Sequence, residues 1–445
     1  MSTAARLPRR RLAVRAAAAA SAAAVLVALA ACTGSAPPAA PDRVASSAAT
    51  SLAGSGDTRD EALQALLGER AAAILAHDRK RFAATLDDPA SAFGRRQLAA
   101  FDALVRLPLR TFSYGVPEPA PELSAQRHAV LGADAWVARV PGSYSLRGYD
   151  AGQRSYESYF TVVHRAGVWR LADDRDGGTQ QQVWDLPGLR VVAGGHVLVA
   201  GNASEATLHG YQRMGRQAIT DVAAVWTAGW PRRLVIVAPR TQNQARDQLA
   251  VEQSDLSQVA AVTDGPQSPE SGLSLADRIV INPQAFAKLR PAGRQVVLSH
   301  EATHAAVRAT SGGQVPTWLS EGFADYVGYR QLGLPRRVVA ADLLKQVRAG
   351  KVPAALPGDA AFDPARGTIA PSYNGAWLAV CLIADRWGER RLVSFYRAAA
   401  GPNTGEQLSA AQVAARADRA FTGVFDTSRA AFTARWRSYL VTLAG

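Results

Sequence analysis

The chain of 445 residues carries 50 Lys and Arg against 37 Asp and Glu, a formal net charge of +13, and only two cysteines. The positive residues are spread along the chain without a dense cluster, which argues against nucleic-acid binding and favours contact with an anionic surface. Five arginines precede Cys32; without them 45 positive residues face 37 negative ones, and the net charge falls to +8.

Residues 1–31 are predicted to be a signal peptide rather than part of the fold. An arginine-rich start is followed by an apolar run, residues 16–28, that is too short to span a membrane. The run ends in Leu29-Ala30-Ala31-Cys32, which resembles a bacterial lipobox. The resemblance implies cleavage before Cys32, a lipid on its thiol, and a protein exported and anchored to the outer face of the cell membrane. The alternative is an ordinary secretory signal with an incidental cysteine.

Lipidation of Cys32 would leave Cys381 alone, so no disulfide within the chain is expected. Cys381 lies in an apolar helical run and is predicted to be a core residue. Residues 32–57 are small, polar and proline-bearing, and are predicted to form a disordered tether. The rest of the chain is long enough for two domains.

The first domain is predicted over residues 58–185, with helices first and strands after them. Apolar spacing predicts helices over residues 61–76 and 93–106. Strands are predicted over 111–114, 126–140, 154–165 and 168–172, with a hairpin turn between the last two. This order resembles the nuclear-transport-factor-like, or cystatin-like, α+β cone fold. The resemblance implies a binding, dimerising or positioning module and no chemistry.

The second domain is predicted over residues 189–445. It begins with short apolar strands, over 190–199 and 234–238, that flank a helix over 203–226. Further strands are predicted over 260–264 and 278–282, and helices over 291–310, from 318 onward, over 335–349, from 372 to 388, over 409–420 and over 427–444. The fold class is therefore α+β, a small mixed sheet followed by a mostly helical part.

The predicted helix over 291–310 contains His300-Glu301-Ala302-Thr303-His304, an H-E-x-x-H pattern. Histidines four residues apart lie on one helical face, so both imidazoles can reach one tetrahedral zinc ion while Glu301 holds the metal's water. Pro291 suits the first turn of this helix, and Ser311-Gly312-Gly313 suits its end.

A catalytic zinc site normally has three protein ligands, and Glu321 is the candidate for the third. It lies in Trp318-Leu319-Ser320-Glu321-Gly322-Phe323-Ala324-Asp325, predicted to form a second helix with Thr317 as its N-cap. Asp325 shares a helical face with Glu321 and is predicted to accept a hydrogen bond from the outer N–H of His300, which would fix the histidine's tautomer.

At these residues the chain resembles the gluzincin metallopeptidases, and in particular the bacterial peptidase MA-like domains. The resemblance implies one zinc ion held by His300, His304 and Glu321, with Glu301 as the general base and Asp325 orienting a ligand. In gluzincins an extended substrate pairs with a strand along the cleft edge, and Arg278-Ile279-Val280-Ile281-Asn282 is the candidate for that strand. Tyr373 resembles a tyrosine that stabilises the oxyanion in the leukotriene-hydrolase/aminopeptidase family, although its glycine comes one residue early.

We therefore expect a membrane-anchored zinc metallopeptidase acting on a peptide or protein. Aminopeptidases of the family that the chain resembles capture the substrate's N-terminal amine with a G-x-M-E-N segment. No such segment precedes His300, so the resemblance favours an endopeptidase over an aminopeptidase. Two alternatives stay open: a non-catalytic envelope lipoprotein that uses the fold for binding or assembly, and a zinc hydrolase of non-peptide amides or esters. The sequence does not fix the oligomeric state.

Overall fold

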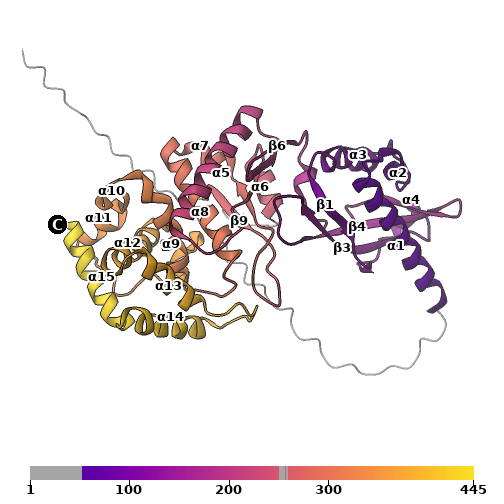
Figure 1. Ribbon diagram of the computed structural model, residues 1–445. Coiled ribbons are helices and arrows are strands. Elements are labelled where there is room, and N and C mark those ends of the chain that lie inside the picture. Colours follow the sequence, from indigo (N-terminus) through magenta and orange to yellow (C-terminus); the bar gives the residue numbers. More distant parts are fainter. Residues whose placement is uncertain (1–52, 250–255, 257–258) are drawn as a thin grey trace, which may run out of the picture.

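The computed structural model describes residues 53–249, 256 and 259–445 (Figure 1). The predicted signal peptide, Cys32 and most of the predicted tether lie outside the described residues. Helix α1 (Ala53–Leu75) begins inside the span predicted as tether, because a helix anchored by its buried leucines extends beyond them at little cost. In the described part of the chain, no helix is both long and apolar enough to span a membrane.

The first part of the chain is a helix group followed by an antiparallel sheet. The helices are α1, α2 (Arg79–Ala83), α3 (Ala92–Leu104) and α4 (Ala125–Leu131). The strands are β1 (Leu109–Tyr114), β2 (Glu118–Pro119), β3 (Trp136–Leu146), β4 (Arg154–Arg165) and β5 (Val168–Asp173). The sheet order is β1-β3-β4-β5, with β2 paired to β3. The predicted hairpin between β4 and β5 is confirmed, while the resemblance to a cone fold stays a prediction.

The second part contains a mixed five-stranded sheet of order β6-β7-β8-β10-β9, with helices around it. The strands are β6 (Arg190–Gly194), β7 (Val197–Gly201), β8 (Leu234–Ala238), β9 (Ala261–Asp264) and β10 (Arg278–Ile281). Among the strands, β7, β8 and β10 run parallel, and β6 and β9 are antiparallel to their neighbours. The mixed α+β class is therefore confirmed.

Most helices of the second part lie on one face of the mixed sheet and continue away from it to the C-terminus, while α6 packs on the face toward the N-terminal part (Figure 1). They are α5 (Glu205–Val225), α6 (Gln242–Leu249), α7 (Pro283–Lys288), α8 (Pro291–Arg308), α9 (Thr317–Tyr329), α10 (Arg336–Val339), α11 (Ala341–Arg348), α12 (Ala370–Trp387), α13 (Glu389–Ala400), α14 (Ala410–Phe425) and α15 (Arg429–Ala444). Cys381 on α12 is buried, as predicted, and burial raises the pKa of its thiol to about 12.

Three predicted elements are each divided in the structure. The strand predicted over 126–140 is helix α4 followed by β3, because Ser124 caps the helix and Gly132 ends it at a left-handed φ of 103°. The strand predicted over 190–199 is the β6–β7 hairpin, which turns at Gly195 with φ of 61°. The helix predicted over 335–349 is α10 and α11, which meet at Ala340.

The two sheets share a hydrophobic core and are joined by buried charges. Phe112, Tyr144 and Trp184 pack in the same cluster as Leu198 and Val237 of the mixed sheet. Asp150, in the β3–β4 turn, accepts two hydrogen bonds from the guanidinium of Arg278 on β10, at 2.7 and 2.8 Å. Both side chains of this pair are at most 3% exposed. The N-terminal sheet is therefore fixed directly to the sheet that lies beside α8.

The candidate for the edge strand was wrong. Arg278–Ile281 forms β10, which lies between β8 and β9 and is buried along its whole length. The edge strand on this side of the sheet is β9 (Ala261–Asp264), which has the same length as β10, and β6 forms the other edge. Both segments are short and apolar, so periodicity did not distinguish an inner strand from an outer one.

Candidate metal centre

Helices α8 and α9 bring the predicted ligands together, and glycines allow the close approach. A Cβ at Gly328 of α9 would lie 2.9 Å from the carbonyl oxygen of Val296 on α8, and one at Gly322 would lie 2.5 Å from that of Ala376 on α12. Helix α9 therefore packs with its backbone close to both neighbours. Its N-cap was misassigned: Thr317 is its first helical residue, and its N–H donates to Oδ1 of Asp359 at 3.2 Å.

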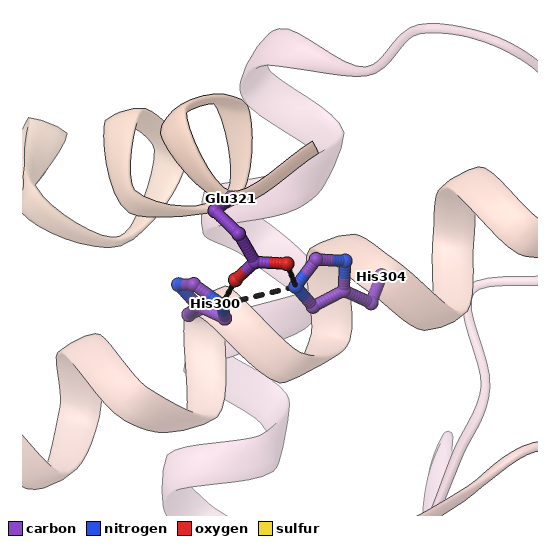
Figure 2. Close-up of side chains that lie close together, drawn as sticks. All are labelled: His300, His304 and Glu321. Atoms are coloured by element: carbon purple, nitrogen blue, oxygen red, sulfur yellow. Dashed lines mark hydrogen bonds and ion pairs between the residues drawn. The ribbon is translucent and has the colours of Figure 1, made fainter. Parts of the chain in front are cut away.

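The three predicted ligands converge on one point (Figure 2). The Nε2 atoms of His300 and His304 are 2.9 Å apart. Glu321 reaches them from α9, with Oε2 3.3 Å from His300 Nε2 and Oε1 3.7 Å from His304 Nε2. One ligand atom from each residue lies within 4.8 Å of the other two. This is the compact arrangement that the i, i+4 histidine spacing predicted.

Asp325 lies behind His300, as predicted. Its Oδ1 is 2.8 Å from His300 Nδ1, so an ionised Asp325 accepts the Nδ1–H and orients the ring with Nε2 toward the cluster. Burial opposes a charge on His300, but the carboxylates of Asp325 and Glu321 outweigh it and raise the pKa of His300 to about 10. Burial likewise opposes a charge on Glu321, yet the two histidines lower its pKa to about 2.

Glu301 is fully buried on α8 beside the cluster, and a contact that the sequence did not reveal holds its carboxylate. Thr263, on the edge strand β9, has its Oγ1 2.7 Å from Oε2 of Glu301 and 2.9 Å from the main-chain oxygen of Glu301. The other carboxylate oxygen, Oε1, has no hydrogen-bond partner among the described residues. Burial raises the pKa of Glu301, and the two histidines and Thr263 act in the opposite direction.

Tyr373, at the start of α12, is buried near the same carboxylates. Its hydroxyl has no hydrogen-bond partner among the described residues, and Phe362 packs edge-on against its ring with centroids 5.1 Å apart. Burial and the charges of Glu321, Asp325 and Glu301 raise the pKa of Tyr373 well above its usual value. The phenol therefore keeps its proton at neutral pH and remains a hydrogen-bond donor.

The cluster fits a zinc ion because it offers suitable ligand atoms and contains a buried oxygen without a hydrogen-bond partner among the described residues. Two imidazoles and one carboxylate are a common ligand set of catalytic zinc. The Nε2 atoms of His300 and His304 face each other. In a tetrahedral site with bonds of about 2.0–2.1 Å, two ligand nitrogens lie about 3.3 Å apart, close to the observed separation. The buried Oε2 of Glu321 has no hydrogen-bond partner in the described part of the chain, and a cation would satisfy it.

The centre is enclosed. His300 and Glu301 are 0% exposed and His304 is 4% exposed. Electrostatic effects are therefore strong in this site.

Comparisons with known proteins give distant structural likenesses only. No protein-family model and no curated protein matches the sequence. The fold is similar to that of a two-domain M1 zinc metallopeptidase mutant bound to L-arginine, with 15% identity, 69% of this chain and 61% of that chain covered, and a TM-score of 0.31. An M1 zinc metallopeptidase mutant from Deinococcus radiodurans gives 16% identity, 70% and 62% coverage, and a TM-score of 0.31. The mutant from the same organism bound to a Tyr-Ser-Ala substrate gives 15% identity, 81% and 73% coverage, and a TM-score of 0.33. The chain thus spans about three fifths of the length of the first two, and its function has to be inferred from the site itself.

Proposed function

We propose that the protein is a zinc-dependent peptidase whose metal is held by His300, His304 and Glu321. The observation that carries this proposal is the convergence of two imidazole nitrogens, 2.9 Å apart, with a buried carboxylate from a second helix. Asp325 supports the arrangement by orienting His300.

The reaction follows from the groups around the cluster. Zinc, when bound, would acidify a water molecule and polarise a carbonyl group. Glu301, whose Oε1 has no hydrogen-bond partner among the described residues, takes the water's proton and delivers it to the leaving amine. Tyr373 donates a hydrogen bond to the substrate oxygen on which negative charge develops. The low exposure of the site keeps competing water away from these groups.

We propose that an extended peptide pairs with the edge strand β9 after the segments that cover it move aside, since Ala261 and Thr263 are 0% and 4% exposed. The N–H of Asn282 donates to the oxygen of Ala260 at 2.9 Å, so the position just beyond the antiparallel ladder of β9 and β10 is a hydrogen-bonded one. Because bonded pairs alternate with unbonded ones, the main-chain groups of Ala261 and Thr263 face away from β10. An extended substrate would pair with them by strand addition. We propose an endopeptidase rather than an aminopeptidase, since no G-x-M-E-N-like segment precedes His300.

The setting of the enzyme is part of the proposal. We propose cleavage before Cys32, lipidation of its thiol and attachment to the outer face of the cell membrane. We also propose that residues 58–185 form a separate domain that positions the peptidase domain, residues 189–445, or its substrate.

The test is cleavage of a peptide library by the zinc-loaded full chain, with and without a zinc chelator, beside a Glu301→Gln variant. The proposal expects cleavage by the wild type that the chelator abolishes, and zinc without turnover in Glu301→Gln. Retained turnover in Glu301→Gln would exclude Glu301 as the base. Zinc binding without cleavage of any peptide would favour the binding-module alternative, and cleavage of esters alone would favour the non-peptide hydrolase.

A further inference from the structure

Thr263 is the residue at which the edge strand contacts the proposed base. It is 4% exposed, lies on β9, and places its Oγ1 2.7 Å from Glu301 Oε2. Among the described residues, no other hydrogen bond to this carboxylate is recorded, and Oε1 has no partner. The hydroxyl therefore fixes one carboxylate oxygen and leaves the other free for the reaction.

The same hydroxyl also lies 2.9 Å from the main-chain oxygen of Glu301. A hydroxyl carries a single proton, so it donates to one of these two oxygens at a time. An ionised carboxylate is the stronger acceptor and takes the proton. The 2.9 Å distance to the main-chain oxygen then shows only that Thr263 packs directly against α8 at Glu301.

The main-chain groups of Thr263 point in a different direction from its side chain. Its N–H and C=O face away from β10, toward the side on which an extended peptide would pair. A single residue therefore presents its backbone to the substrate side and its side chain to the base.

We propose that Thr263 is a positioning residue that aligns Glu301 with a peptide paired along β9. This inference rests on the proposed peptidase function, which makes Glu301 the base. It adds a role for a residue that lies outside α8 and α9, the helices that carry the proposed ligands and the proposed base. The competing explanation is that Thr263 only fills space in the core beside α8, in which case its hydroxyl is dispensable.

The experiment compares the full-length wild type with Thr263→Val, which keeps the branched shape without the hydroxyl, and Thr263→Ser, which keeps the hydroxyl. Thr161→Val is the matched control, since Thr161 is 0% exposed on β4 and its hydroxyl donates to a carboxylate away from the metal centre, Oδ2 of Asp176 at 2.6 Å. Each protein is assayed for zinc content, thermal unfolding, kcat and KM on one peptide that the wild type cleaves. A crystal structure of each shows the position of the Glu301 carboxylate.

We expect Thr263→Val to retain zinc and lose about 10- to 100-fold in kcat, with KM changed by less than about threefold, since the lost contact orients a reacting group. Thr263→Ser should restore most of kcat, and Thr161→Val should resemble the wild type. In the crystals, Glu301 should leave its position only in Thr263→Val. Wild-type kcat in Thr263→Val, or an unmoved carboxylate, would overturn the proposal. If the wild type cleaves no peptide, the peptidase function fails, and the carboxylate position in the crystals still decides whether Thr263 orients Glu301.

Discussion

Breaking the buried pair between Asp150 and Arg278 should destabilise the protein strongly, because it leaves one buried charge without its partner. Two hydrogen bonds of 2.7 and 2.8 Å join side chains that are 2% and 3% exposed, and Asp150 Oδ2 also accepts from the N–H of Leu146 at 2.7 Å. Asp150→Ala would leave the guanidinium buried without its carboxylate. The expected loss is about 3–5 kcal/mol of unfolding free energy.

The assay is chemical denaturation of the purified full chain, followed by far-ultraviolet circular dichroism. Asp102→Ala is the matched control, because Asp102 pairs with Arg79 at 3.0 Å while both side chains are about half exposed, and such pairs contribute about 0–1 kcal/mol. A double variant, Asp150→Leu with Arg278→Met, should recover much of the loss, since it removes both charges. A loss for Asp150→Ala no larger than for Asp102→Ala would refute the argument that this pair fixes the two sheets together.

Three further predictions concern the metal centre. Gly322→Ala should lower the free energy of unfolding by about 1–3 kcal/mol and weaken zinc binding, since its Cβ would lie 2.5 Å from the oxygen of Ala376. The control Gly423→Ala, whose Cβ would have no atom within 4 Å, should raise the free energy of unfolding by about 0.5–1 kcal/mol. Equal effects of the two variants in chemical denaturation would contradict this prediction. Tyr373→Phe should keep zinc and lose about 100-fold in kcat, and an unchanged kcat would remove the tyrosine from the mechanism. Zinc uptake at pH 7 should release about one proton, because His300 has a pKa of about 10 without metal, and affinity should rise with pH up to that value. Calorimetry in buffers of different ionisation enthalpy measures this release, and no proton exchange would contradict it.

The sequence predicted the ligand geometry well because the pattern is local. Histidines four residues apart on a helix share a face whatever the rest of the fold does, and His300 and His304 do so. Glu321 and Asp325 lie on one face of α9 for the same reason. Bringing α9 against α8 is a tertiary property, and it depends on Gly328, where a Cβ would lie 2.9 Å from the carbonyl oxygen of Val296.

The features that the sequence missed depend on contacts between distant segments. Nothing local distinguishes Arg278–Ile281 as an inner strand from Ala261–Asp264 as the edge, because strand order is set by pairing across the sheet. The Thr263 contact to Glu301 joins residues 38 positions apart, and Thr317 receives its cap from Asp359, 42 positions away. The split of residues 126–140 was local, however, and Ser124 and Gly132 were its readable signals.

The most direct test of the metal centre is the zinc content of the purified full chain beside Glu321→Ala and a control variant, Glu205→Ala, whose side chain is 76% exposed on α5. The account predicts one zinc ion per chain in the wild type and in Glu205→Ala, and its loss in Glu321→Ala. Zinc that remains in Glu321→Ala, or a wild type that takes up none, would contradict the proposed centre.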